Sequence, residues 1–268
     1  MSNIYWGVSG ALHDGANPTI LVISDSWFWY PIDNLAIEIG GAMPNQTLVV
    51  VGSNGAEAAQ WSDKLRKSID FAYKMYGNSV QALMLSGGGN DVAGTSDFLR
   101  ILNDNCSKAT SATECFRPGQ PDAIIAKIIG AYKEVILRFR AYNPNAPIFM
   151  HNYDNAWPTG KGFFGPGDWL KVPMDLAKVP KDMALRRDLF KTLIAALRTA
   201  QLALAKDKTV GPGPLVAIKS AGTMPEPVDP AAQADDQWWA NELHPTPKGF
   251  RLLATKAFIP ALKSNGLV

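Results

Sequence analysis

The sequence predicts an α/β fold in which a mostly parallel sheet of five strands lies between two layers of helices, a three-layer α/β/α sandwich. Two observations support this prediction. Five short apolar runs end in polar or glycine residues, which is typical of strands buried on both faces. Between these runs lie longer segments with apolar residues at helical spacing, and strands that alternate with helices form parallel βαβ units with right-handed crossovers. The predicted strands span residues 19–23, 47–51, 82–86, 147–150 and 215–218.

The helices between these strands have recognisable starts and stops. The helix after the first strand is expected to open in the aromatic run at residues 27–30 and to end before Gly40 and Gly41. Asp122 can cap a later helix, and Pro144 ends it. The predicted helices span residues 27–39, 56–76, about 122–142, 181–206 and 247–263.

Three stretches are expected to lie outside this alternation. Residues 1–18 are rich in Gly, Asn and Ser and suggest an irregular arm, and residues 92–121 suggest an insertion with one short helix. Residues 155–180 are rich in Gly, Pro and Trp. Long loops in compact domains are usually functional, and the aromatic residues argue against disorder, so we expect a lid or substrate-binding insertion here. The chain is thus expected to form one domain over residues 1–268 with two insertions.

The overall composition excludes several classes of protein. The chain has 268 residues, of which 47% are apolar and 19% charged, and it is long enough to bury a large core. A formal net charge of +2 gives no bias toward nucleic acid or anionic membranes, and no apolar run is long enough to span a bilayer. We therefore expect no nucleic-acid partner and no integral membrane contact. No secretory signal is visible near the start, so a soluble, cytoplasmic protein is the default expectation.

The two cysteines, Cys106 and Cys115, lie in one polar stretch and bear on the compartment. They could close a short disulfide loop if the protein works outside the cytoplasm, or remain free thiols in a reducing compartment. No histidine or further cysteine lies at ligand spacing from them, so we predict no metal site. A P-loop, a dinucleotide fingerprint and a metal-binding helix motif are all missing, so no cofactor is expected.

Polar or glycine-rich residues follow four of the predicted strands, at the edge where parallel strands end and ligands bind. Ester cleavage by a serine requires a base that reaches the hydroxyl, a group that orients the base, and donors for the developing oxyanion. Ser26 follows the first strand, where free N–H groups of the next segment favour negative charge. His244, one of only three histidines, lies just before the last helix and is the strongest candidate base. Asn90 and Gly55 can provide oxyanion donors at the ends of two other strands.

Each of these residues also has a purely structural interpretation. Ser26 can cap a helix, His244 can be a surface residue at a helix start, and Asn90 and Gly55 can be turn residues. What favours chemistry is their order along the chain.

In this order of motifs, the chain resembles the SGNH (GDSL-type) hydrolases from residue 19 to the last helix. Four segments carry the resemblance. They are Ser-Asp-Ser at 24–26 for the family's Gly-Asp-Ser, Gly-Ser-Asn-Gly at 52–55 for its second-block glycine, Gly-Gly-Asn-Asp at 88–91 for its third block, and Asn-Glu-Leu-His-Pro at 241–245 for its Asp-x-x-His-Pro.

The resemblance implies a flavodoxin-like SGNH hydrolase fold and a serine esterase. It implies that Ser26 is the nucleophile and His244 the general base. It further implies an oxyanion hole formed by the N–H groups of Ser26 and Gly55 and the side chain of Asn90.

Two departures from the family pattern matter. Ser24 replaces a glycine, and Asn241 stands where the family usually has an aspartate. An amide can fix the tautomer of His244 but carries no charge to favour the imidazolium. Three possibilities follow: Asn241 orients His244 as a neutral acceptor, a main-chain carbonyl near residues 238–239 does so, or the site is impaired. We favour the first two together, with Asp235 and Asp236 as reserve partners.

The ester substrate is expected to be a small molecule, a glycan or a lipid, bound by residues near the presumed site. A lipid-like acyl chain suits the aromatic insertion, and an O-acetyl group on a carbohydrate suits Trp157 and Trp169 as stacking platforms. The alternative from another class is a binding module that has lost its chemistry with the change at residue 241. The residues expected to contact substrate are Asp25, Trp27, His151, Tyr153, Trp157 and Trp239.

Overall fold

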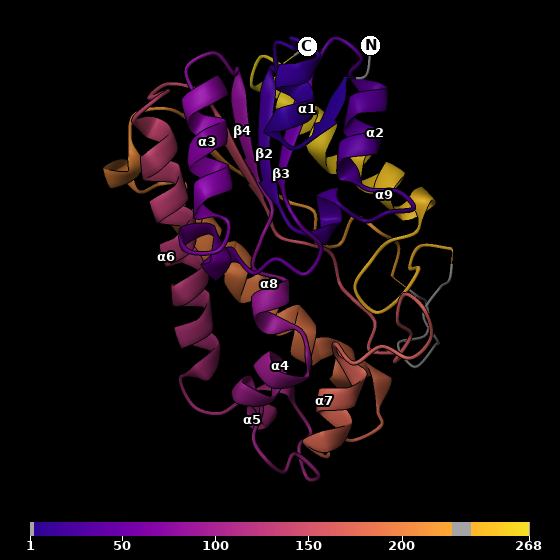
Figure 1. Cartoon of the computed structure of the whole chain (residues 1–268). Coiled ribbons are helices and arrows are strands. Elements are labelled where there is room, and N and C mark those ends of the chain that lie inside the picture. Colours follow the sequence, from indigo (N-terminus) through magenta and orange to yellow (C-terminus); the bar gives the residue numbers. More distant parts are fainter. Residues whose placement is uncertain (1–2, 227–236, 268) are drawn as a thin grey trace.

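The computed structural model describes residues 3–226 and 237–267 and contains a parallel sheet with helices on both faces (Figure 1). The strands are β1 (Ile4–Trp6), β2 (Ile20–Ser24), β3 (Leu48–Gly52), β4 (Ala82–Leu85), β5 (Ile148–His151) and β6 (Leu215–Ile218). The helices are α1 (Val8–His13), α2 (Leu35–Ala42), α3 (Arg66–Tyr76), α4 (Thr95–Ile101), α5 (Ala112–Cys115), α6 (Gln120–Arg140), α7 (Lys171–Leu176), α8 (Met183–Leu204), α9 (Pro247–Leu253) and α10 (Ile259–Ser264). The predicted α/β fold class is therefore confirmed.

The order of the strands places a crevice at the end of β2. The sheet runs β1-β3-β2-β4-β5-β6, and every neighbouring pair is parallel. The chain leaves β2 for β3 on one side and later returns across β2 to β4 on the other. Such a reversal opens a crevice at the carboxyl end of the central strand, which is where ligands bind in open α/β sheets. In this chain the residue that follows the crevice strand is Asp25, and Ser26 comes next.

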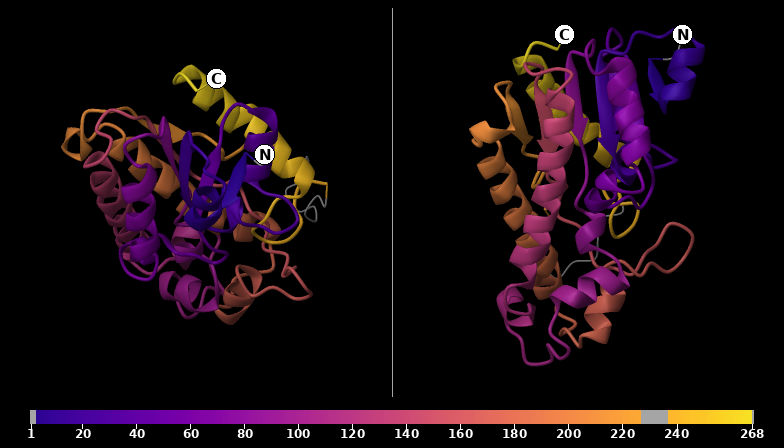
Figure 2. Two further views of the ribbon diagram at one scale, coloured as in Figure 1. Left: turned by 45° about the horizontal axis from the view of Figure 1, so that its top comes forward. Right: turned by 60° about the vertical axis from the view of Figure 1, so that its left-hand side comes forward.

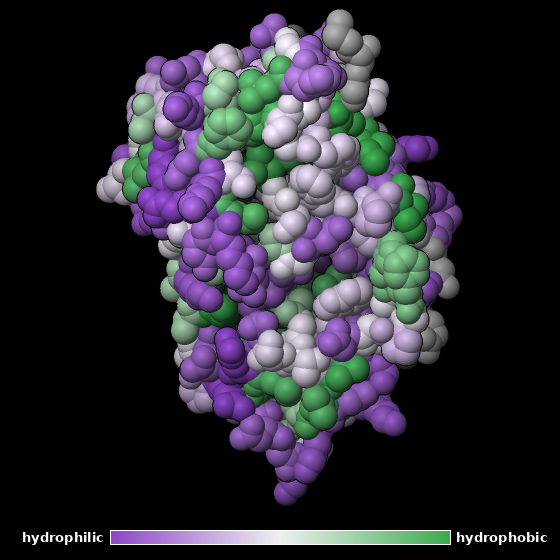
Figure 3. Space-filling view, in the orientation of Figure 1, coloured by the Kyte–Doolittle hydropathy of each residue, from purple (hydrophilic) through white to green (hydrophobic). Residues whose placement is uncertain are grey.

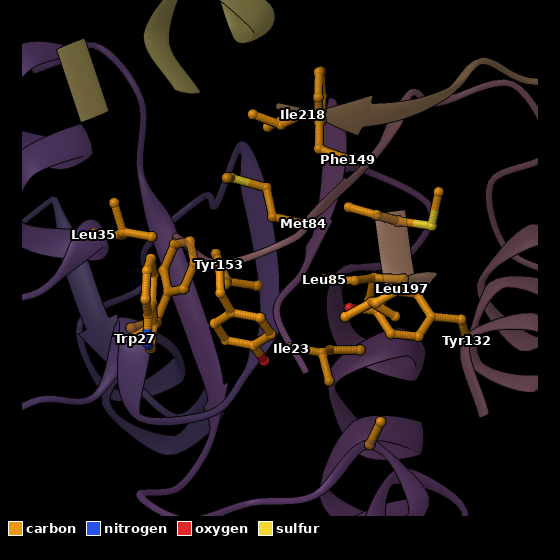
Figure 4. Close-up of a cluster of buried hydrophobic side chains, with 14 of the residues drawn as sticks. Ile23, Trp27, Leu35, Met84, Leu85, Tyr132, Phe149, Tyr153, Leu197 and Ile218 are labelled. Atoms are coloured by element: carbon orange, nitrogen blue, oxygen red, sulfur yellow. The ribbon is translucent and has the colours of Figure 1, made fainter. Parts of the chain in front are cut away.

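Helices cover both faces of the sheet, because the chain crosses from β2 toward one edge of the sheet and from β3 onward toward the other. Helices α3, α6 and α8 lie on one face, while α2 and α9 lie on the other (Figures 1 and 2). All five residues of β2 are buried, in agreement with its continuous apolar run. Figure 4 shows the core that this strand shares with its neighbours, in which Trp27 and Tyr153 lie side by side near Leu35.

The expected count of five strands was wrong, because β1 adds a sixth. Residues 1–18 were expected to be irregular, yet they contain β1 and α1. Three residues are too few to show an apolar period, and β1 exists because its backbone pairs with the open edge of β3, with Tyr5 opposite Val49. Tertiary pairing thus determines this strand.

The predicted helix over residues 27–39 was also wrong in its bounds. A short 3-10 turn, η1 (Ser26–Phe28), follows β2, and α2 begins only at Leu35, where the Asn34 side chain accepts a hydrogen bond from the Ile37 N–H. Gly40 and Gly41 lie inside α2 rather than after it. A Cβ on Gly40 would come within 2.8 Å of the Ile4 side chain, so glycine there allows α2 to pack closely against β1.

Two other predicted helices are interrupted. Residues 56–76 form a 3-10 segment, η2 (Ala58–Ser62), followed by α3, and the last helix is divided into α9, a π-helical turn η5 (Ala254–Phe258), and α10. The remaining short turns are η3 (Asn90–Val92) and η4 (Lys208–Val210).

The two expected insertions carry α4, α5 and α7. These helices lie together at the end of the molecule opposite to both chain termini (Figures 1 and 2). Cys106 and Cys115 lie in this region as buried free thiols.

The face seen in Figure 1 mixes hydrophilic and hydrophobic residues, and its hydrophobic residues form small separate groups (Figure 3). Within the described ranges, each helix is too short or too polar to cross a membrane.

Candidate active site

Ser26 lies at the carboxyl end of β2, held by its neighbours on both sides. The Asp25 N–H donates to the Ser86 carbonyl, and the Asp25 carboxylate accepts from the Trp27 N–H at 3.0 Å. On the other side, Gly52 pairs with Ser24, and a Cβ on Gly52 would lie only 1.9 Å from the Ser24 carbonyl oxygen. Gly52 is therefore required for strand packing, which leaves Gly55 as the glycine that faces the site.

Ser26, His244 and Asn241 form a continuous hydrogen-bonded relay. The Ser26 Oγ lies 2.7 Å from His244 Nε2, and His244 Nδ1 lies 3.0 Å from Asn241 Oδ1. Residues separated by more than 200 positions in the chain are thus brought into direct contact. These are the distances that a serine nucleophile, its base and an orienting group require.

The orientation of the Asn241 amide follows from its other contacts. Its Oδ1 also accepts the main-chain N–H groups of Leu243, at 3.0 Å, and of His244, at 2.8 Å. Both are obligatory donors, so the atom that faces them, and also faces His244 Nδ1, must be the oxygen. His244 therefore carries its proton on Nδ1 and presents a free lone pair on Nε2 to the Ser26 hydroxyl.

Tyr30 contacts both the side-chain amide of Asn241 and the imidazole of His244. Its hydroxyl accepts from Asn241 Nδ2 at 3.0 Å, and its ring stacks on His244 with centroids 4.3 Å apart and an interplanar angle of 11°. The Trp169 ring is nearly perpendicular to the imidazole, with ring centroids 5.9 Å apart. Burial among these rings lowers the pKa of His244 to about 4, so the imidazole is neutral at pH 7 and able to accept a proton.

The alternative partners of His244 are engaged elsewhere or lie outside the described residues. The Trp238 carbonyl accepts from the Thr246 N–H at 2.9 Å. Asp235 and Asp236 lie outside the residues that the structure describes. Asn241 is thus the group that contacts Nδ1.

The expected oxyanion donors line one cavity of about 260 Å³ together with Ser26 and His244. The Asn90 side-chain amide donates one hydrogen to the Ala56 carbonyl at 3.0 Å and has a second hydrogen available. Gly55 adopts a φ of +73°, and a Cβ added to it would meet no atom within 4 Å. Within residues 3–226 and 237–267, the N–H groups of Ser26 and Gly55 donate to no other residue. Both remain available to an anionic ligand.

A second, much smaller cavity of about 20 Å³ also touches Ser26 and Asn90. Its apolar walls include Trp27, Tyr153 and Phe190. His244 borders the larger cavity and not this one. A volume of this size holds about one water molecule or methyl group.

Asp25 and His151 form a buried polar network beneath the serine. The Asp25 carboxylate accepts from the Tyr153 hydroxyl at 2.5 Å and from the Ser86 hydroxyl at 3.0 Å, and Ser86 in turn lies 2.7 Å from His151 Nε2. Burial raises the pKa of Asp25 to about 6 and lowers that of His151 to about 3. This network fixes the side chain of Asp25, the residue before Ser26.

The insertion at residues 155–180 reaches the site and is fastened there by a buried carboxylate. Glu242, between Asn241 and His244 in the chain, accepts the N–H groups of Gly160 at 2.8 Å, Leu170 at 3.1 Å and Lys171 at 2.9 Å. This anchoring places Phe163 and Trp169 in the wall of the larger cavity.

Three of the residues expected to contact substrate face neither cavity. Trp157 is buried with the Arg187 guanidinium 3.8 Å above its ring, Trp239 is buried beside Pro245, and His151 lies below Ser86. Packing closes off all three side chains, so they do not provide a substrate surface. Asp25, Trp27 and Tyr153 do line the small cavity.

Tyr30 and Glu242 are site residues that sequence reasoning missed. Tyr30 belongs to an aromatic run that reads as core, and a single tyrosine in such a run carries no signal of its own. Glu242 carries no sequence signal of its own either, because its burial among several N–H donors appears only in the structure.

The arrangement can remove a proton from a hydroxyl, stabilise an adjacent oxyanion and return the proton to a leaving group. This is the equipment for acyl transfer to serine.

Comparison with known proteins supports this reading of the fold. The model of the GDSL-like Lipase/Acylhydrolase family matches residues 23–252. No match is found among curated proteins.

Several solved structures share the fold at low sequence identity. A phospholipase A1 from Streptomyces albidoflavus NA297 is 15% identical, over 94% of this chain and 100% of that chain, with a TM-score of 0.52. The lipase Lip_vut3 from a goat rumen metagenome is 10% identical over 93% and 98%, with a TM-score of 0.52. An extracellular lipase from Streptomyces rimosus is 13% identical over 92% and 99%, with a TM-score of 0.50.

Proposed function

The chain belongs to the GDSL-like lipase/acylhydrolase family, and from this premise we propose that it cleaves carboxylic esters through an acyl-enzyme formed on Ser26. The observation that carries the proposal is the relay from Ser26 Oγ to His244 Nε2 and from His244 Nδ1 to Asn241 Oδ1.

In the first half-reaction, Ser26 Oγ attacks the ester carbonyl carbon while its proton passes to His244 Nε2. The carbonyl oxygen becomes an oxyanion and receives hydrogen bonds from the Ser26 N–H, the Gly55 N–H and the Asn90 amide. His244 Nε2–H then protonates the leaving alkoxide as the bond between the carbonyl carbon and the alcohol oxygen breaks.

In the second half-reaction, water takes the place of the alcohol. His244 removes its proton, the resulting hydroxide attacks the acyl carbon, and the carboxylic acid leaves as Ser26 Oγ regains a proton. Each proton moves at Nε2, which is the nitrogen that the Asn241 contact leaves unprotonated.

A neutral amide at residue 241 raises the activation free energy relative to a carboxylate, but it does not prevent the reaction. Asn241 fixes the tautomer but lacks the charge that would stabilise the imidazolium formed in each transition state. The stacked Tyr30 ring partly compensates, because a cation beside an aromatic face gains about 0.5–2 kcal/mol. This supports an active enzyme over a binding module without chemistry.

The test is labelling by a fluorophosphonate probe together with hydrolysis of p-nitrophenyl esters. The native protein should be labelled and should hydrolyse short esters, and Ser26→Ala should abolish both activities. Ser24→Ala provides a matched control, because Ser24 is the buried last residue of β2, two positions before Ser26, and its Oγ contacts no described polar atom. Equal labelling of Ser26→Ala, or no labelling of the native protein, would refute the proposal.

A further inference from the structure

Two cavities of very different size meet at Ser26. One measures about 260 Å³ and the other about 20 Å³, and both are bordered by Ser26, Asn90 and Leu243. A tetrahedral centre on Ser26 Oγ has three further substituents: the oxyanion, the leaving oxygen and the acyl carbon. The oxyanion belongs at the N–H groups of Ser26 and Gly55 and the Asn90 amide, and the two cavities are the spaces at Ser26 that the leaving oxygen and the acyl carbon can occupy.

The position of the base decides which substituent enters which cavity. His244 must deliver a proton to the leaving oxygen, and a general acid acts only within hydrogen-bond reach. His244 borders the large cavity alone. The alcohol part of the ester therefore lies in the large cavity, and the acyl part points into the small one.

We propose that the small cavity is the acyl subsite and restricts the enzyme to acetyl esters of bulky alcohols. This inference rests on the proposed function of Ser26 and His244. A volume of about 20 Å³ accepts a methyl group and leaves little room for further methylenes.

Hydrogen bonds and close packing hold the side chains that form the walls of the small cavity. Tyr153 is buried, and its hydroxyl donates to Asp25 at 2.5 Å. Its ring packs against Gly89, where a Cβ would come within 2.8 Å. Trp27 Nε1 donates to the Leu243 carbonyl at 3.2 Å, and the Trp27 ring meets Tyr153 edge-on at 5.1 Å. Figure 4 shows the side chains of Trp27 and Tyr153. Phe190, from α8, is also buried.

The large cavity, which we assign to the alcohol part of the ester, is wide and continues into exposed aromatic surface. Tyr30, Phe163 and Trp169 present aromatic rings to the large cavity. Phe164 meets Phe163 at 4.1 Å and is 93% exposed, which extends the apolar surface beyond the cavity. Aromatic surfaces of this kind suit an alcohol with a broad apolar face, such as an acetylated sugar ring or an aryl acetate.

The first test varies the acyl chain at constant alcohol. With p-nitrophenyl acetate, butyrate and octanoate, kcat/KM of the native protein should fall at least tenfold from acetate to butyrate and further to octanoate, since each misfitting methylene is worth about 10-fold or more in specificity. Equal or higher kcat/KM for butyrate would overturn the assignment.

The second test widens the subsite. Phe190→Leu and Phe190→Ala should raise the ratio of butyrate to acetate kcat/KM by about tenfold. Leu193→Ala is the matched control, because Leu193 is a buried residue of the same helix that borders neither cavity, and it should keep the native ratio. If folded Phe190→Leu leaves the ratio unchanged while Ser26-dependent hydrolysis persists, the subsite is assigned wrongly.

The third test varies the alcohol. Phe164→Ala should lower kcat/KM about tenfold or more for a peracetylated hexose and leave p-nitrophenyl acetate nearly unchanged, because only the larger alcohol reaches beyond the cavity. An equal effect on both substrates would contradict the assignment of the large cavity to the alcohol. Absence of Ser26-dependent hydrolysis of every ester would instead overturn the proposed function, and this inference with it.

Discussion

Replacing Asn241 by aspartate should increase esterase activity at neutral pH, in contrast to most changes at a catalytic relay. The new carboxylate keeps the geometry: one oxygen still accepts from Leu243 N–H, His244 N–H and His244 Nδ1–H, as Oδ1 does now. The other oxygen replaces Nδ2 beside the Tyr30 hydroxyl, which can rotate its proton and donate instead of accepting. No buried polar atom therefore loses a partner.

The magnitude follows from the charge placed 3.0 Å from His244 Nδ1. An opposite charge within hydrogen-bond range changes a pKa by about one to three units, and each unit corresponds to about 1.4 kcal/mol. Only part of this stabilisation is expressed in the transition state, so we expect about a tenfold increase of kcat/KM at pH 8. In serine proteases, the reverse change, from aspartate to asparagine, costs about 10⁴ because it produces the wrong tautomer. Here two main-chain N–H groups already fix the tautomer, which makes the effect smaller.

The pH profile provides the decisive readout. His244 works as a base only when neutral, so activity is present above its pKa and is lost as the pH falls through it. Burial sets this pKa at about 4 in the native protein, so the acid limb of kcat/KM should lie near pH 4. In Asn241→Asp the limb should move up by about one to three pH units, and the gain in activity should shrink toward pH 5.

The assay is a pH-stat titration of acetate ester hydrolysis, and Asn241→Ala serves as the control. The alanine variant leaves the N–H groups of Leu243 and His244 and the Nδ1–H of His244 without an acceptor and should lose activity about a hundredfold or more. An acid limb that stays near pH 4 in Asn241→Asp, or a large loss of activity with the fold intact, would refute the reasoning.

Three other predictions concern the remaining parts of the site. Asn90→Ala should lower kcat by about 10²–10³ with little change in KM, because it removes one oxyanion donor, and steady-state kinetics would show this. Glu242→Ala should cost a few kcal/mol of unfolding free energy and raise KM, because one buried and two partly buried N–H groups lose their acceptor. Urea denaturation and kinetics test both effects, with Glu242→Gln as the milder change. Gly52→Ala should unfold or severely destabilise the protein through its 1.9 Å approach to Ser24, whereas Gly55→Ala, with nothing within 4 Å, should cost only about 1 kcal/mol of backbone strain; parallel thermal melts would distinguish them.

The sheet and its main helices could be predicted because burial on both faces leaves a continuous apolar run in the sequence. Residues 20–24 are an example, since every side chain in β2 is buried. The strand β1 could not be found in this way, because three residues show no period and their conformation depends on the edge of β3. The bounds of α2 were missed for a similar reason. A glycine often ends a helix, but Gly40 lies inside α2, where it permits close contact with Ile4.

Residues of the candidate site could be predicted where they belong to one of the four motifs. Ser26, His244 and Asn241 were named from sequence, and the structure brings them within hydrogen-bond distance. The role of Tyr30 depends on a ring that stacks on His244 across more than 200 residues of chain, and no local pattern encodes such a contact. Trp157 is the opposite case, a residue that the sequence suggested for the site and the structure places outside it. A tryptophan in an aromatic insertion suggested a stacking platform, but its burial under Arg187 depends on long-range packing.

The position of Glu242 in the same turn as His244 links the insertion to the base. Gly160, Leu170 and Lys171 donate amide hydrogen bonds to a side chain two residues before the imidazole, so these amides exchange with solvent when the insertion separates from the turn that carries His244. Deuterium uptake at these three amides would thus report how often that attachment opens. It also follows that a transplanted insertion without matching N–H groups would leave a bare buried carboxylate beside the relay.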